Sequence, residues 1–165
     1  MSKTQNRMKM NENGSLPDGW KHVKLADVVV RARQVNPART PHSQFKYVDV
    51  SSISRENLRI ESYEKHHAED APSRARKMIK TGDVTFATVR PNLRRIALVP
   101  SGLDGEICST AFYVIRANPD LADGEYLYFA VSWDDFVNRV SGHQRGSSYP
   151  AVTGGGGPGC LAMSQ

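Results

Sequence analysis

The pattern of hydrophobic and polar residues predicts several short β-strands, by alternation with a period of two in 20–25 and 58–64 and by β-branched, aliphatic and aromatic residues in the others. The segments are 20–25 (WKHVKL), 45–50 (FKYVDV), 58–64 (LRIESYE), 84–89 (VTFATV), 94–100 (RRIALVP) and 108–117 (CSTAFYVIRA). Residues typical of turns, above all Gly, Pro, Asp and Ser, separate most of them. We therefore expect mostly β-structure, in which 84–89 pairs with 94–100, while 73–79 (SRARKMI) fits either a helical turn or a strand.

One stretch instead has the three-to-four residue spacing of a helix that buries one face. It spans about 123–141, with Asp123 placed as the N-cap and Gly142 placed to end the helix. The apolar stripe consists of Tyr126, Phe129, Ala130, Trp133, Phe136, Val137 and Val140. Together the patterns predict an α+β fold: a mixed, strongly twisted β-sheet scaffold with one well-defined helix.

The 165 residues suffice for one domain with a core and are too few for two ordinary domains. We expect a disordered N-terminal segment (1–15), a folded domain (16–153) and a glycine-rich tail (154–165) that is truncated or disordered. No run of about 18 apolar residues is present, and the first residues lack the apolar region of a secretory signal. We therefore expect a cytoplasmic protein that does not enter a membrane.

Positive charge is concentrated in one section of the chain. The net charge is +5 and the pI is about 9.4, a weak indication of a polyanionic partner. Basic residues dominate 74–96, where Asp83 is the single acid, whereas acids dominate 118–140, where Arg139 is the single base. Runs of like charge often form only a solvated face, so the residue types within the basic section carry more weight than its charge.

Two basic connectors combine side chains suited to reading base pairs, RPNLRR (90–95) and HQRGSSY (143–149). Arginine can donate two hydrogen bonds to guanine, asparagine and glutamine can pair with adenine, and serine and lysine suit phosphates. We expect one arginine of the pair 94–95 to face solvent, since neighbouring strand residues point to opposite faces. The candidate DNA-binding residues are Arg74, Arg76, Lys77, Arg90, Asn92, Arg94, Arg95, Gln144, Arg145, Ser147, Ser148 and Tyr149.

The sequence assigns no catalytic or metal-binding residue. The pair His66 and His67 lies near acids, but the spacing is neither HxH nor HExxH. As an alternative function, a magnesium-dependent nuclease acting on nucleic acid would use Asp49, Glu64 and Lys65, although nothing in the pattern brings these side chains together.

Two further groups of residues bear on the class of protein. An RNA-binding domain would present several exposed aromatic rings, and Tyr149 is the only aromatic residue in the two basic connectors. The two cysteines, Cys108 and Cys160, are too few for a disulfide framework and too isolated for a zinc site, so we expect unpaired thiols.

The order of the motifs resembles a target recognition domain from the DNA-specificity subunit of a type I restriction–modification system. The entry LPDGWKHVKLADVV (16–29), the strand YVDVSSI (47–53), and above all SRARKMIKTGDVTFATVRPNLRRIALV (73–99) carry the resemblance. The segments CSTAFYVIRAN (108–118), YLYFAVSWDDFVNRV (126–140) and GSSYPAVT (146–153) continue it in the same order.

The resemblance implies a DNA methylase specificity domain-like fold that reads one half of a split double-stranded DNA target. It implies no catalysis and no cofactor in this chain: a partner modification subunit uses S-adenosylmethionine to methylate adenine, and a restriction subunit uses ATP and Mg²⁺. The pattern departs from the family after Thr153, where GGGGPGC replaces the usual link and helix. A full specificity subunit has two recognition domains with long helices, and such helices are not apparent here.

Overall fold

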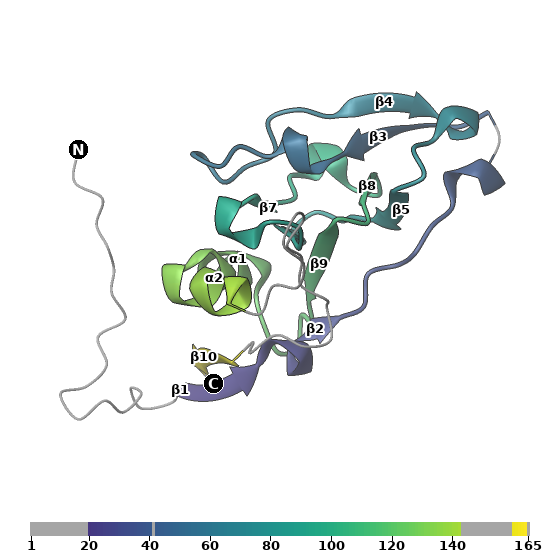
Figure 1. Ribbon diagram of the computed structural model, residues 1–165. Helices are drawn as coiled ribbons and strands as arrows, with labels where there is room; N and C mark the ends of the chain where they lie inside the picture. The colour runs from purple at the N-terminus through teal and green to yellow at the C-terminus, as the bar shows by residue number, and fades with distance from the viewer. Residues whose placement is uncertain (1–19, 41, 143–159, 165) are drawn as a thin grey trace.

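The computed structural model describes residues 20–40, 42–142 and 160–164 (Figure 1). The first sheet has the order β2 (Val29–Val30), β9 (Phe112–Ala117), β6 (Val84–Ala87), β7 (Ile96–Leu98). The second has the order β4 (Glu64–His67), β3 (Gln44–Val48), β8 (Ile107–Ser109), β5 (Ala75–Met78). Strand β1 (Trp20–Lys24) pairs with β10 (Cys160–Ser164).

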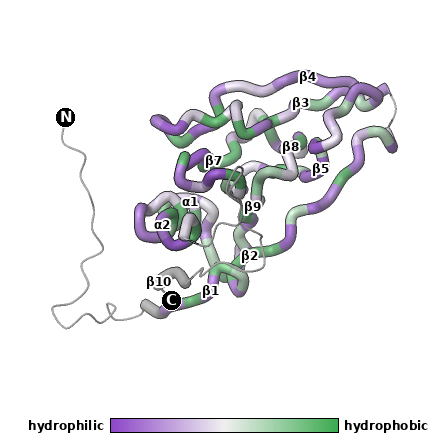
Figure 2. Tube along the Cα trace, viewed as in Figure 1, coloured by the Kyte–Doolittle hydropathy of each residue, from purple (hydrophilic) through white to green (hydrophobic). Residues whose placement is uncertain are grey.

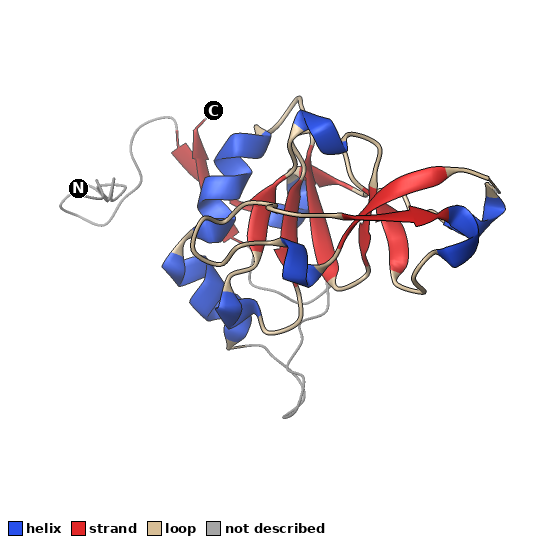
Figure 3. Cartoon of the chain, turned by 90° about the horizontal axis from the view of Figure 1, so that it is seen from above, coloured by secondary structure: helices blue, strands red, loops and turns tan. Residues whose placement is uncertain are grey.

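Helices α1 (Gly124–Ser132) and α2 (Asp134–Ser141) lie on one side of the molecule, away from β3 and β4 (Figures 1 and 3). Short 3₁₀ turns connect many strands: η1 (Leu25–Asp27), η2 (Pro37–Arg39), η3 (Val50–Ser52), η4 (Ala68–Asp70), η5 (Pro91–Leu93) and η6 (Ser101–Leu103). Strand β3 runs parallel to β8, while the other pairings are antiparallel. The predicted α+β fold with mixed pairing and the predicted pairing of β6 with β7 are confirmed.

Strand β6 is buried on both faces, and its side chains alternate between two cores. Val84 and Phe86 pack in a core shared with the helices, where Leu127 and Val131 are fully buried. Ala87 belongs to the other core, which includes Phe112 and joins the two sheets. Strand β9 alternates in the same way. Successive side chains of these central strands therefore point into two different cores, so both faces of the strands are buried. Strand β4, in contrast, is largely polar and exposed (Figure 2).

The single helix expected over 123–141 is broken. Asp123 caps α1 as predicted, because its carboxylate accepts a hydrogen bond from the backbone N–H of Tyr126 at 3.0 Å. Trp133, however, has an extended backbone (φ −70°, ψ 145°) that ends α1 and starts α2. Trp133 and Phe129, both expected in the buried stripe, are 40% and 67% exposed.

The break has a physical reason in the helical period of about 100° per residue. The face of α1 that buries Leu127 and Val131 would, in an unbroken helix, next carry Asp134 and Asp135 into the core. The buried residues of α2 are instead Phe136, Val137 and Val140, as predicted. The extended residue rotates α2 so that its apolar side chains, rather than its acids, face the sheet.

Three further expectations are corrected. Of the strand expected over 58–64, residues 58–63 form none: Leu58 has a left-handed backbone (φ 50°), and β4 begins at Glu64, the last residue of that segment, and continues to His67. The long strand expected over 108–117 bends at Thr110 and Ala111 and contributes to both sheets as β8 and β9. Within 154–165, expected to be truncated or disordered, residues 160–164 form β10, whereas 1–15 and 154–159 lie outside the described residues.

In the described part of the chain, no helix is long and apolar enough to cross a bilayer. Cys108 is a free thiol with no exposed surface, which confirms the expectation for this cysteine.

We expect Cys108 to resist alkylation in the folded protein, because burial raises the pKa of its thiol to about 12 and the thiolate is the reactive form. Iodoacetamide at pH 8 should label Cys108 only after unfolding in urea. Peptide mass spectrometry reads Cys108 separately from Cys160, and labelling of Cys108 at the same rate before and after unfolding would contradict this burial.

Candidate nucleic-acid interface

The bend at Thr110 and Ala111 gathers strand ends from both sheets. The backbone N–H of Thr110 donates to the carbonyl of Arg74, which precedes β5 (2.9 Å), and Thr88, which follows β6, donates to the carbonyl of Ala111 (2.9 Å). The end of β3 lies beside them, since Val48 pairs with Cys108. We call this meeting of strand ends around Thr110 and Ala111 the inter-sheet junction. It brings Arg74 and the connector 90–95 to one region of the molecule.

The connector that opens at this junction has a strained backbone. Arg90 (φ 49°, ψ 59°) and Arg94 (φ 54°, ψ 41°) both adopt the left-handed conformation, one on each side of η5. This conformation costs a residue other than glycine about 1–2 kcal/mol. Pro91 is buried and suits the first position of η5, whereas the side chains of Arg90 and Asn92 are exposed. Strain of this kind often accompanies functional positions.

Arg94 and Arg95 hold this connector to its surroundings. The guanidinium of Arg94 binds the carboxylate of Asp134 and the carbonyl of Ser132, where α1 gives way to α2. Arg95 donates to the backbone carbonyls of Val50 (3.1 Å) and Ile53, in and next to η3. The expectation that one of the pair simply faces solvent is wrong: both lie before β7, both are partly buried, and both donate hydrogen bonds within the protein.

The predicted DNA-binding residues in and just before β5 also differ in exposure. Arg74 is exposed. Lys77 is half-buried, and its ammonium donates to the carbonyls of Thr110 and Phe112 across the junction, so that desolvation lowers its pKa. Arg76 is partly buried and donates to the carbonyl of Ala75 (2.8 Å). The remaining candidates lie outside the described residues: Gln144, Arg145, Ser147, Ser148 and Tyr149.

A buried ion pair, which the sequence pattern did not indicate, lies at the opposite end of β6 and β9 from the junction. Asp83 is 2% exposed, and its two carboxylate oxygens accept hydrogen bonds from Nε (2.9 Å) and one terminal nitrogen (2.7 Å) of Arg116. The carboxylate raises the pKa of Arg116. The backbone N–H of Lys80 also donates to Asp83 (2.8 Å). This pair fixes the turn before β6 to β9, so its role is structural.

The same turn explains two glycines. Gly82 has φ +82°, a conformation that favours glycine. Its carbonyl oxygen would lie 2.4 Å from a Cβ atom placed on Gly124, at the start of α1. A side chain at Gly124 would therefore separate the helix from the sheet.

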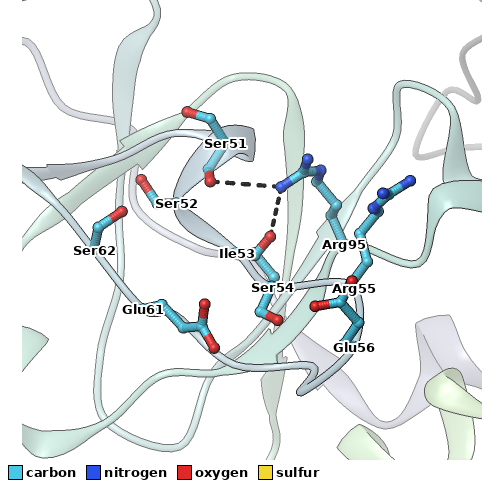
Figure 4. Close-up of a pocket in the computed structure, with 9 residues that line it drawn as sticks. All are labelled: Ser51, Ser52, Ile53, Ser54, Arg55, Glu56, Glu61, Ser62 and Arg95. Carbon is cyan, nitrogen blue, oxygen red and sulfur yellow. Dashed lines mark hydrogen bonds between the residues drawn. The ribbon is translucent and has the colours of Figure 1, made fainter.

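Beside Arg95 lies an open, polar hollow of about 270 Å³ (Figure 4). Its lining residues are Ser51, Ser52, Ile53, Ser54, Arg55, Glu56, Glu61, Ser62 and Arg95. The segment between Ile53 and Ile60, which form an antiparallel bridge, makes one wall. It contains the exposed charged residues Arg55, Glu56 and Arg59, which the sequence analysis treated as part of a turn and a strand. The sequence feature that could have identified this segment as a site is its run of Arg, Glu and Asn at a turn.

The residues considered for metal or nuclease chemistry have other partners. His66 contacts Glu64 (2.9 Å) and lies against the rings of Phe45 and Tyr47. The carboxylate of Asp49 caps η3 together with Ser52. Within the described ranges, no group of three or more His, Cys, Asp or Glu side chains is placed to hold a metal ion. The geometry gives no support to the nuclease alternative.

Comparisons with known proteins agree on one class. The chain is 24% identical over 136 residues to the type I restriction enzyme HindI specificity subunit of Haemophilus influenzae, covering 81% of this chain and 29% of that protein. No protein-family model matches the chain. Two solved structures resemble it more closely in sequence.

The first comes from a study of complex assembly and conformational transition of the type I R-M system. It matches 90% of this chain with a TM-score of 0.85 and 43% identity. The second, the HsdS subunit from Thermoanaerobacter tengcongensis, matches 84% of this chain with a TM-score of 0.78 and 46% identity. The chain spans 39% and 36% of these two structures.

Proposed function

Since the chain is a homologue of the specificity subunits of type I restriction–modification systems, we propose that it recognises one part of a double-stranded DNA target for such an enzyme. The chain contributes recognition, and methylation and cleavage belong to modification and restriction subunits that bind S-adenosylmethionine, ATP and Mg²⁺. The chain itself needs no cofactor for this role.

The observation that supports this proposal most strongly is the inter-sheet junction. It collects exposed Arg74, Arg90 and Asn92 around strand ends that are hydrogen-bonded to one another. Arginine and asparagine are the side chains that pair most readily with guanine and adenine in the major groove. Lys77, Arg94 and Arg95 brace the same region from inside, which keeps the exposed side chains in fixed positions.

Selection from a randomised duplex library tests the proposal. The purified chain should enrich a short sequence, and its affinity for that duplex should fall steeply with salt. With roughly five phosphates neutralised, the slope of log affinity against log salt should be about −4 to −5. Equal affinity for all duplexes would contradict sequence recognition. Incubation with Mg²⁺ alone should leave the selected duplex intact.

Arg90 is expected to contribute directly to recognition. Replacement of Arg90 with alanine should weaken binding to the selected duplex by about 1–3 kcal/mol and relax the preference at one base pair. Replacement with glycine should weaken binding by a similar amount and leave the protein more stable than the alanine variant, because glycine suits the backbone at φ 49°.

Fluorescence anisotropy with the selected duplex and with single-base variants measures the binding, and urea unfolding measures the stability. Weakening that is uniform across all duplexes would assign Arg90 to a phosphate contact instead.

Mapping of methylated adenines tests the proposed partners. Cells that express the full-length gene product with its modification subunit should carry methylated adenines within one bipartite motif, one half of which matches the selected sequence. A motif without that match would contradict the proposed assembly and leave the binding result unchanged.

A further inference from the structure

We propose that the hairpin formed by residues 53–60 is a second base-reading element, in which Arg55 and Glu56 contact a G·C pair through the major groove. This inference rests on the proposed function. It concerns a segment separate from the basic connectors, and it names the chemistry of the contact.

The hairpin is closed and firmly anchored at its base. Ile53 bridges Ile60, and the backbone N–H of Ser54 donates to the carbonyl of Arg59 (3.0 Å). Ile53 is 1% exposed in the core between the sheets. Its carbonyl accepts a hydrogen bond from Arg95. The base of the hairpin therefore cannot move independently of the junction.

The tip of the hairpin is braced as well. Leu58 has a left-handed backbone (φ 50°), and its N–H donates to the carbonyl of Ser54 (3.1 Å). Its own carbonyl accepts a hydrogen bond from the hydroxyl of Tyr128 on α1 (2.8 Å). The side-chain amide of Asn57 donates a hydrogen bond to the carboxylate of Glu61 (2.7 Å). Because this bond engages the amide, Asn57 is not a candidate for reading adenine. Strain at Leu58 resembles that at Arg90 and Arg94.

The side chains that remain exposed on this rigid tip are charged and of both signs. Arg55 extends beside Arg95 at the edge of the hollow, and Glu56 follows it directly (Figure 4). A surface that bound only phosphates would not need a carboxylate, since the carboxylate would be repelled. A G·C pair, in contrast, presents two acceptors on guanine and one amino donor on cytosine, which match a guanidinium and a carboxylate.

The shape of the segment suits the same contact. The major groove of B-DNA admits a two-stranded β-ribbon, and this segment is a short turn closed by one antiparallel bridge, as at the end of such a ribbon. Arg95, the last residue of the connector 90–95, binds the carbonyl of Ile53 at the base of the hairpin, and its side chain lies beside that of Arg55 (Figure 4), so we place the duplex over both the connector and the hairpin.

Variants at Arg55 and Glu56 test the inference with the duplex selected above. Arg55→Ala should weaken binding roughly 10-fold to 100-fold and flatten the preference at one G·C pair. Arg55→Lys should lose most of the same preference, because lysine keeps the charge and loses the paired donors. Glu56→Gln should flatten the preference for the cytosine of that pair. Arg39→Ala serves as the matched control, since Arg39 is exposed in η2, beyond the other end of β3.

The outcomes separate this inference from the proposed function. If the chain selects a duplex but Arg55→Ala and Glu56→Gln keep every base preference, the hairpin does not read bases and the proposed function stands. If Arg55→Lys binds every duplex as tightly as the unaltered protein, and Glu56→Gln strengthens binding to all duplexes equally, the hairpin contacts only phosphates. That result would overturn the inference. A chain that selects no duplex contradicts the proposed function itself.

Discussion

Replacement of Asp83 with alanine is expected to lower the free energy of unfolding by about 3–5 kcal/mol, because it leaves the charge of Arg116 without its partner in a partly buried site. The side chain of Arg116 is 17% exposed and that of Asp83 is 3% exposed. The variant also removes the acceptor for the backbone N–H of Lys80. Urea unfolding followed by circular dichroism measures the loss.

A control variant and a double variant accompany this experiment. Asp120→Ala removes an exposed acid and should change stability by less than about 0.5 kcal/mol. The double variant Asp83→Asn, Arg116→Met removes both charges. Its loss of unfolding free energy should be smaller than the summed losses of the single variants Asp83→Asn and Arg116→Met. Strict additivity of the two changes would show that the carboxylate and the guanidinium are not coupled.

Replacement of Phe136 with alanine should cost about 3–5 kcal/mol, whereas replacement of Phe129 should cost little. The ring of Phe136 is 5% exposed and packs edge-on against Phe86, with ring centroids 5.8 Å apart. Phe129 is 67% exposed. Both residues belong to the apolar stripe of the sequence, so the pair tests the rotation of α2 at Trp133 directly.

The measurement is again the midpoint and slope of urea unfolding for the two variants. Similar losses for Phe129 and Phe136 would indicate one continuous helix and contradict the break. A large loss for Phe136 alone fits the described packing.

The sequence pattern was sufficient for β3, β6 and β7, whose segments are rich in β-branched, aliphatic and aromatic residues that become buried. It was insufficient where the chain changes direction and over 58–63, where alternation predicted a strand that does not form. The bend at Thr110 interrupts a segment whose composition suits one long strand. The two halves separate because they hydrogen-bond to different neighbours, and a local pattern does not record such long-range pairing.

The candidate site was predicted in part for the same reason. Composition identifies the arginine-rich connector 90–95, which follows the inter-sheet junction in the structure, whereas the connector 143–149 lies outside the described residues. Composition does not show which cationic side chains are exposed and which are partly buried, so it groups the partly buried Lys77, Arg94 and Arg95 with the exposed Arg74 and Arg90. The hairpin tip was missed because Arg55 and Glu56 carry opposite charges and form no basic run.

The internal partners of Arg95 and Lys77 are main-chain carbonyl oxygens, which every amino acid supplies. The bonds of Arg95 therefore depend on the backbone at 50 and 53 and not on the polar chemistry of those side chains, although Ile53 must still fill the core. Positions on the surface nearby can be exchanged without rebuilding the framework beneath them.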